Sequence, residues 1–148
     1  MNTDRRIAEV ICEQLESDHP VVLASIVDLQ GSSPRHRGAK MVVSADGKSY
    51  GTIGGSLLEH TAIHEAEAVL IEQKSRFMDF DLTADGAASA GMICGGRAVV
   101  LLDYISASEE NVELFQCWHE AVSRGNDFYF LTQVRDGHNG ISLSLIHI

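Results

Sequence analysis

One stretch of the sequence, residues 20–29, is apolar almost without interruption. It reads PVVLASIVDL and is rich in Val and Ile. A short, largely continuous apolar run of this kind is typical of a strand that lies buried at the centre of a sheet. A second run, RAVVLLDY at residues 97–104, has the same character. The two runs predict a sheet as the framework of the fold.

Three segments have the apolar spacing of amphipathic helices. Residues 3–17 repeat Ile, Val and Leu at helical intervals and end before Pro20. Residues 56–73 follow Gly54-Gly55, and we expect Ser56 to be the N-cap because Glu59 stands three positions later. The third helix begins at Ser108 and ends in a basic last turn before Gly125.

Shorter segments have the alternation or flanking turns of strands. They are residues 40–44, 49–53, 76–82, 128–134 and 141–148, and Asp46-Gly47 between the first two is a hairpin signal. Helices and strands interleave, but hairpins also occur. The sequence therefore predicts an α+β fold with a mixed β-sheet and about three helices, in a single domain over residues 1–148.

Composition narrows the class of protein. The 148 residues have a formal net charge of −10, which opposes binding to nucleic acid. No apolar run approaches the roughly 20 residues that span a bilayer, and the N-terminus lacks a secretory signal, so we expect a cytoplasmic protein. Three cysteines without a CxxC pair argue against a disulfide framework and a zinc ribbon.

Positive charge is concentrated in the glycine-rich segment of residues 31–59. Four of the eleven basic residues lie within fourteen positions that hold one acid, Asp46; they are Arg35, Arg37, Lys40 and Lys48. Gly54 and Gly55 precede a helix N-terminus, where free N–H groups favour an anion. The segment predicts a cradle for a small anionic ligand. The alternatives are solvated loop charges and a plain tight turn.

Known nucleotide motifs are missing, because GTIGGS lacks GxGxxG spacing and GSSPRHRGAK lacks the GK[ST] of a P-loop.

Cys94 lies in a second glycine cluster, GMICGG, at residues 91–96. Three roles are open for Cys94. Arg97 or a helix N-terminus would lower the pKa of its thiol and make the thiol reactive. Alternatively, a soft metal centre could contact its sulfur, or the residue could be purely structural. His60 and His64 lie four apart on the second helix, but solvated histidines are commoner there than metal ligands.

The motifs GSSPRHRGAKMVV, DG, GTIGGSLLE and GMICGG, in this order, resemble the N-terminal domain of the XdhC/CoxI family over about residues 5–135. This family comprises accessory proteins of molybdenum hydroxylases such as xanthine dehydrogenase. The resemblance implies a chaperone without turnover of its own. Such a protein binds the molybdenum cofactor, assists its sulfuration with a cysteine desulfurase, and delivers it to the apo-enzyme. We expect it to act as a homodimer.

The resemblance also suggests residues for these roles. We expect Arg35, Lys40, Gly54 and Gly55 to hold the anionic end of the cofactor. Cys94, with Gly95 and Gly96, would contact the molybdenum or carry sulfur. The central expectation is that the two glycine-rich segments face one another across a shared cleft.

Two departures from the family pattern stand out. Ser56 replaces a usual third glycine, and nothing corresponds to the C-terminal Rossmann-like domain of longer members, so we expect a single-domain member or a truncated chain. Two other functions remain open. One is a small oxidoreductase or nucleotidyl-transfer domain that acts on an anionic molecule with Cys94 as reactive thiol; the other is an interaction module that dimerises through a sheet edge.

Overall fold

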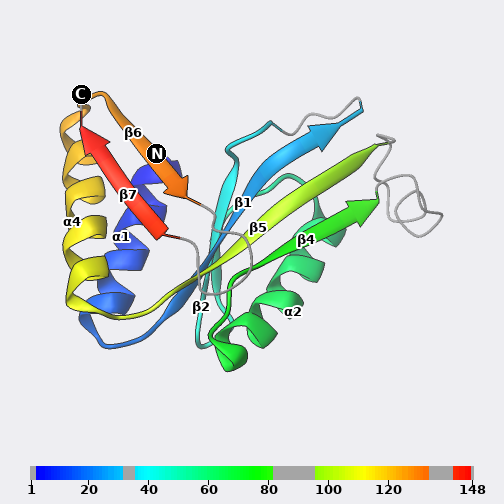
Figure 1. Ribbon diagram of the computed structural model, residues 1–148, viewed down its shortest axis with the longest axis horizontal. Coiled ribbons are helices and arrows are strands. Elements are labelled where there is room, and N and C mark those ends of the chain that lie inside the picture. Colours follow the sequence, from blue (N-terminus) through cyan, green and yellow to red (C-terminus); the bar gives the residue numbers. More distant parts are fainter. Residues whose placement is uncertain (1–2, 32–35, 82–95, 134–141, 148) are drawn as a thin grey trace.

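The computed structural model describes residues 3–31, 36–81, 96–133 and 142–147. At its centre is a five-stranded sheet with the order β3-β2-β1-β5-β4 (Figure 1). Its strands are β1 (Val21–Gln30), β2 (Lys40–Ser44), β3 (Ser49–Gly51), β4 (Arg76–Asp81) and β5 (Arg97–Ile105). A second sheet pairs β6 (Phe128–Gln133) with β7 (Ser142–His147), and the helices of the described residues are α1 (Thr3–Glu16), α2 (Ser56–Glu72) and α4 (Glu109–Arg124). The predicted α+β class is confirmed.

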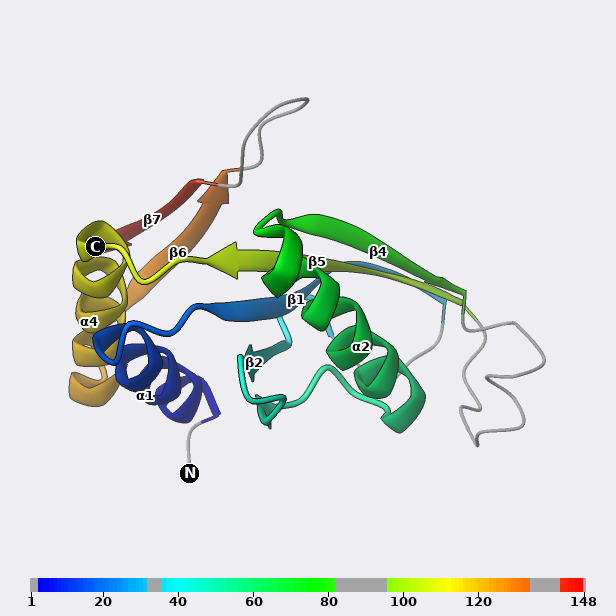
Figure 2. The same cartoon turned by 90° about the horizontal axis from the view of Figure 1, so that it is seen from below.

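The pairing within the sheet differs from the mixed pairing that we expected. Every strand pair in the described residues is antiparallel. The physical reason is the path of α2. This helix connects β3 to β4, which run in the same direction but form opposite edges of the sheet. Figure 2 shows α2 lying along one face of the sheet. Parallel neighbours need a crossover that returns to the adjacent position, and α2 instead passes across a whole face.

Helices cover the sheet on both faces. On one face α2 packs against the central strands, in a cluster that includes Val22, Ala24, Met41, Leu58, Ala62, Val100 and Leu102. On the other face α1 and α4 cover the opposite side chains, in a cluster that includes Ile7, Ile11, Leu23, Val42, Ile105, Phe115 and Trp118. The strands β6 and β7 lie beside α4 (Figure 1). Trp118 of α4 contacts Phe130 of β6, with ring centroids 4.9 Å apart.

Strand β1 is buried only along its first part. Residues 21–24 and Ile26 are buried, as expected of a central strand, but the strand then extends past α1 and α4 and its remaining residues are partly or fully exposed. A β-bulge lies between Ile26 and Asp28. Because one extra residue reverses the alternation of side chains, Leu29 packs into the α2 cluster and Gln30 faces the opposite side. The bulge therefore places polar side chains on an uncovered part of the sheet.

The start of α2 corrects the capping that we expected. The N-cap residue is Gly55, and Ser56 is the first residue of the helix. The Glu59 carboxylate accepts hydrogen bonds from residues that precede the helix. The third helix has the caps that the sequence predicts: the Ser108 side chain accepts from Asn111 N–H, and Gly125 is left-handed.

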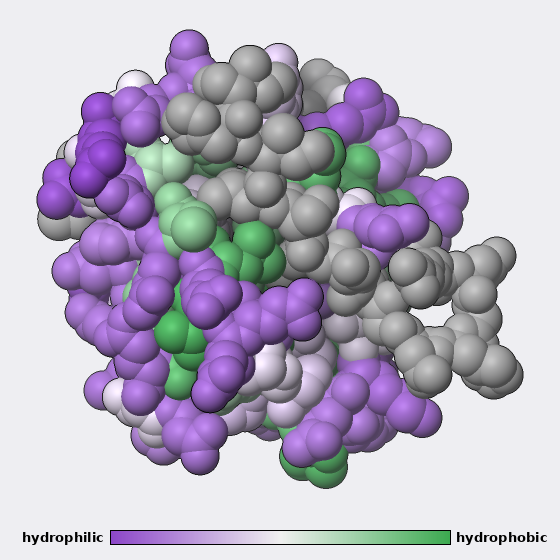
Figure 3. Space-filling model, turned by 60° about the vertical axis from the view of Figure 1, so that its left-hand side comes forward, coloured by the Kyte–Doolittle hydropathy of each residue, from purple (hydrophilic) through white to green (hydrophobic). Residues whose placement is uncertain are grey.

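Two further features concern the surface and the cysteines. No helix in the described part of the chain is long and apolar enough to cross a bilayer. Figure 3 shows a mostly hydrophilic face with a smaller apolar area near its middle. Cys12 packs in the cluster between α1, α4 and the sheet, and burial raises the pKa of its thiol to about 11, as is typical of a cysteine that acts as a small buried hydrophobe.

Candidate functional site

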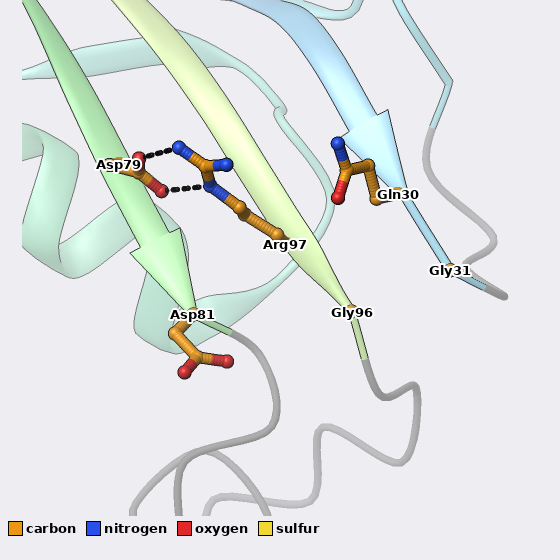
Figure 4. Close-up of a pocket in the computed structure, with 6 residues that line it drawn as sticks. All are labelled: Gln30, Gly31, Asp79, Asp81, Gly96 and Arg97. Atoms are coloured by element: carbon orange, nitrogen blue, oxygen red, sulfur yellow. Dashed lines mark hydrogen bonds and ion pairs between the residues drawn. The ribbon is translucent and has the colours of Figure 1, made fainter.

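Three polar side chains form a row across the uncovered end of the sheet. Arg97 of β5 is the register partner of Gln30 on β1 and of Asp81 on β4. Residues directly opposite one another on neighbouring strands point to the same face, so all three side chains lie on one side of the sheet. They line a hollow of about 460 Å³ together with Gly31, Asp79 and Gly96 (Figure 4).

The guanidinium group of Arg97 is held by Asp79. Arg97 Nε donates to Asp79 Oδ1 at 2.6 Å, and Arg97 Nη2 donates to Asp79 Oδ2. This bidentate pair lowers the pKa of Asp79 and raises the pKa of Arg97. Both side chains are about half exposed, so the pair contributes little to stability. Its consequence is geometric, because a fork of two bonds fixes the plane of the guanidinium group.

The main chain at Gly96 lies against the end of β1. A Cβ at this position would be 2.0 Å from the carbonyl oxygen of Gln30 and 3.2 Å from Gly31 Cα, and the φ angle of Gly96 is +138°. Only glycine fits both the contact and the angle. The first glycine of one glycine-rich segment and the last glycine of the other are therefore side by side. Of the residues that we expected in the second segment, Gly96 is described, whereas Cys94 and Gly95 lie outside the described residues.

Lys40 lies at the start of β2 and does not line the hollow. The next residue, Met41, packs against α2, and neighbouring residues of a strand point to opposite faces of the sheet. The Lys40 side chain therefore lies on the face that α1 covers. Lys40 Nζ donates to the Gly38 carbonyl oxygen at 2.7 Å. Burial lowers the pKa of the Lys40 ammonium, while the charge of Asp4 on α1 raises it. Arg35, its expected companion, lies outside the described residues.

The amides near Gly54 already hold a carboxylate of the chain itself. Glu59 Oε1 accepts from the N–H of Ile53 at 3.1 Å and of Gly54 at 3.2 Å, and also from Thr52 Oγ1. These are donors of the kind that we had assigned to a ligand anion. Gly54 and Gly55 lead into α2, which covers the face opposite to Lys40. The structure thus brings Gly96 to the hollow and places Lys40, Gly54 and Gly55 elsewhere.

Asp79 and Asp81 have no role in the sequence analysis. Their alternation in RFMDFD does place both on one face of β4, and this was the available signal. Gln30 could not be found in the same way, because without the bulge its side chain would point to the α2 face. Asp28, displaced by the same bulge, binds Arg37 at 2.8 Å, and this contact lowers the pKa of Asp28.

One carboxyl group away from the hollow is unusual. Asp103 of β5 is only 2% exposed, and burial raises its pKa to about 7. Its Oδ1 accepts from Ser75 Oγ at 3.0 Å, while Oδ2 is buried without a hydrogen-bond partner in the structure as described. A buried carboxyl group of this kind is stable mainly in its neutral form.

Part of the chain matches the model of a known protein family. Residues 14–81 match the model of the XdhC and CoxI family. The chain is 41% identical over 87 residues to the uncharacterized protein YqeB of Escherichia coli K12, a match that covers 59% of the chain and 16% of YqeB. It is 22% identical over 124 residues to a probable xanthine dehydrogenase subunit of Bacillus subtilis 168, a match that covers 84% of the chain and 38% of that protein.

The fold is also similar to that of a solved structure. The crystal structure of a xanthine dehydrogenase from Bacillus halodurans matches with a TM-score of 0.75 and 25% identity, over 99% of this chain and 42% of that one. The chain thus spans less than half the length of each of these relatives. The match of residues 14–81 to the XdhC and CoxI family model confirms the resemblance drawn from the sequence motifs.

Proposed function

We propose that this chain is an accessory protein of a molybdenum hydroxylase. In this proposal it binds the molybdenum cofactor as cargo, supports its sulfuration by a cysteine desulfurase, and delivers it to an apo-enzyme of the xanthine dehydrogenase type, without turnover of its own. The match of residues 14–81 to the XdhC and CoxI family and the names of the similar proteins support the association with such enzymes. We propose a homodimer as the active form.

The observation that carries the proposal is the contact of Gly96 with Gln30 and Gly31. It brings the first glycine of one glycine-rich segment, Gly31, next to the last glycine of the other, Gly96, at one end of the sheet and beside a hollow that Arg97 lines. The cofactor carries a phosphate or nucleotide at one end and a dithiolene-bound metal at the other. A long ligand with two different ends needs contacts from two segments that meet, and these segments do.

Within the proposal, Arg35 holds the anionic end and Cys94 contacts the metal centre or carries sulfur. An anion at Gly54 would have to displace the Glu59 carboxylate from the amides of Ile53 and Gly54. For this reason the hollow beside Arg97, and not the start of α2, is the part of the described structure that fits the cargo.

The test is activation of a partner enzyme. A xanthine dehydrogenase-type apo-enzyme is produced in cells that make the cofactor but lack their own accessory protein, with and without this chain. The proposal predicts that the chain raises enzyme activity per enzyme molecule, and that Cys94→Ala does not. Equal activity with and without the chain would contradict the accessory role. Oxidation of a substrate by the purified chain alone would favour the alternative of a reactive-thiol enzyme.

A further inference from the structure

Two side chains of the hollow face one another across the gap between β1 and β5. Gln30 and Arg97 are register partners on these strands, so both side chains lie on the uncovered face of the sheet. Arg97 bonds to Asp79 through Nε and Nη2, which turns the guanidinium group toward β4 and leaves Nη1 on the side of β1. Figure 4 shows this third nitrogen pointing toward the Gln30 amide, with open space between the two. A ligand atom in that space is within reach of both groups.

In the described part of the chain, neither of these groups has a hydrogen-bond partner. No described residue bonds to the side-chain amide of Gln30, and none accepts a hydrogen bond from Arg97 Nη1. The Gln30 amide has two N–H donors and one carbonyl acceptor, whereas Nη1 has donors only. The two side chains therefore offer donors from opposite sides to one acceptor atom of a ligand, and an acceptor for a donor beside that atom.

The charges around these groups argue against an anionic ligand. Arg97 is paired with Asp79, and the charges of Asp28 and Asp81 also act on it. Arg37 is bonded to Asp28 and thus adds no unpaired positive charge. An anion in the hollow would meet more negative than positive charge. A neutral polar group suits the hollow better than the charged end of the cargo.

The neutral group that matches these donors and acceptors is a cyclic amide, or lactam. In a lactam ring the carbonyl oxygen and the N–H lie side by side on one edge. The oxygen has two lone pairs, one for Arg97 Nη1 and one for a Gln30 N–H, and the ring N–H donates to the Gln30 carbonyl oxygen. Pterins carry such an edge at their 4-oxo group, and guanine carries one at its 6-oxo group.

We propose that the hollow binds the lactam edge of a neutral heterocycle, from a pterin or a guanine base, between Arg97 and Gln30. Arg97 Nη1 and the Gln30 amide donate to the ring oxygen, and Gln30 accepts from the ring N–H. Asp79 is a positioning residue, because its two bonds hold Nη1 on the side of β1. A volume of about 460 Å³ is in the range of small-molecule sites. The inference rests on the proposed function, for which it names the part of the cargo that enters the hollow.

The test compares ligands that differ only at the lactam edge. The purified chain is titrated with 6-hydroxymethylpterin and with 2,4-diamino-6-hydroxymethylpteridine, in which an amino group replaces the 4-oxo group. GMP and 2-aminoadenosine 5′-monophosphate form a second pair, with the same replacement at the purine ring. We expect the oxo member of at least one pair to bind at least about tenfold tighter, because its analogue turns N–H donors toward the donors of Arg97. The pair that shows the preference identifies the source as pterin or guanine.

A change at Gln30 tests its part in the recognition. Gln30→Glu replaces the amide by a carboxylate, which accepts hydrogen bonds but donates none. This variant should lose the preference for the oxo ligands or reverse it toward the amino ligands. Gln133→Glu is the matched control, since it makes the same change at an exposed position at the end of β6, and it should keep the preference of the parent.

A change at Asp79 tests the positioning of Arg97. Asp79→Asn should reduce the oxo preference, because Nη1 is no longer held on the side of β1, and Asp79→Glu should restore part of it. The unfolding midpoint should stay that of the parent, since the pair is half exposed. Asp127→Asn, at an exposed position between α4 and β6, is the control. A purely structural role of Asp79 would instead lower the midpoint and leave the preference unchanged.

Three outcomes overturn the inference. They are no binding of any of the four ligands, equal binding within both pairs, or an unchanged preference in Gln30→Glu. The inference and the proposed function can fail separately. Activation of the partner enzyme without an oxo preference would remove only the inference, and an oxo preference without activation would remove only the accessory role.

Discussion

Gly96 and Gln30 are in contact so close that a β-carbon on Gly96 would lie 2.0 Å from the Gln30 carbonyl oxygen. The contact joins the ends of β1 and β5 and sets the position of Arg97 directly after it. The geometry of the hollow therefore depends on a residue without a side chain.

The first prediction concerns this contact. Gly96→Ala should destabilise the chain by about 2–4 kcal/mol, because the added carbon forces β1 and β5 apart and the φ of +138° disfavours alanine. Gly47→Ala is the control, since Gly47 also has a positive φ, of +82°, but nothing lies within 4 Å of its added carbon. Urea unfolding measures the free energy of unfolding of both variants. Equal losses in the two variants would show that the contact has no effect of its own.

The second prediction concerns pH. The pKa of Asp103 is raised to about 7 in the folded chain, against an ordinary value of 3.8. The folded state thus binds the proton more tightly, and stability falls as pH rises through this range. Between pH 5 and pH 8 the carboxyl group should lower the free energy of unfolding by roughly 2–3 kcal/mol.

Asp103→Asn isolates this effect, because asparagine has a similar shape and does not ionise. The stability of the variant relative to the parent should increase from pH 5 to pH 8, as followed by urea unfolding at each pH. A constant difference between the two proteins across this range would mean that Asp103 does not titrate there.

The third prediction concerns the start of α2. Glu59→Ala should lower the free energy of unfolding by about 1–2 kcal/mol, because the Ile53 amide and the Thr52 hydroxyl lose their acceptor and the Gly54 amide keeps only Thr52 Oγ1. Glu67→Ala, an exposed change on the same helix, is the control. Thermal unfolding should give a clearly lower midpoint for Glu59→Ala only. Matching midpoints would show that water replaces the carboxylate without loss.

The fourth prediction separates stability from binding at Arg97. Arg97→Ala should unfold at the same urea concentration as the parent within experimental scatter, since its pair with Asp79 is half exposed. The same variant should lose the cofactor cargo, because the hollow loses its donor. Retention of the cargo together with unchanged stability would remove Arg97 from the site.

The sequence predicted the elements better than their arrangement. Apolar runs and caps located the helices and strands, since these are local signals. The antiparallel pairing was missed because the edge-to-edge path of α2 is a property of the whole sheet. Gln30 was missed because a single bulge after Ile26 decides which face it occupies. The spacing predicted that Glu59 would form a capping box with Ser56, but the Glu59 carboxylate accepts a hydrogen bond from the Thr52 hydroxyl.

The central claim is that the chain holds the molybdenum cofactor, and its most direct test is the pterin content of the purified chain. The protein is isolated from cells that make the cofactor and is then oxidised, so that released pterin becomes fluorescent and can be counted per chain. The account predicts pterin in the parent and in Asp127→Asn, and a loss of most of it in Arg97→Ala. A parent chain without pterin, isolated from an extract that contains the cofactor, would contradict the account.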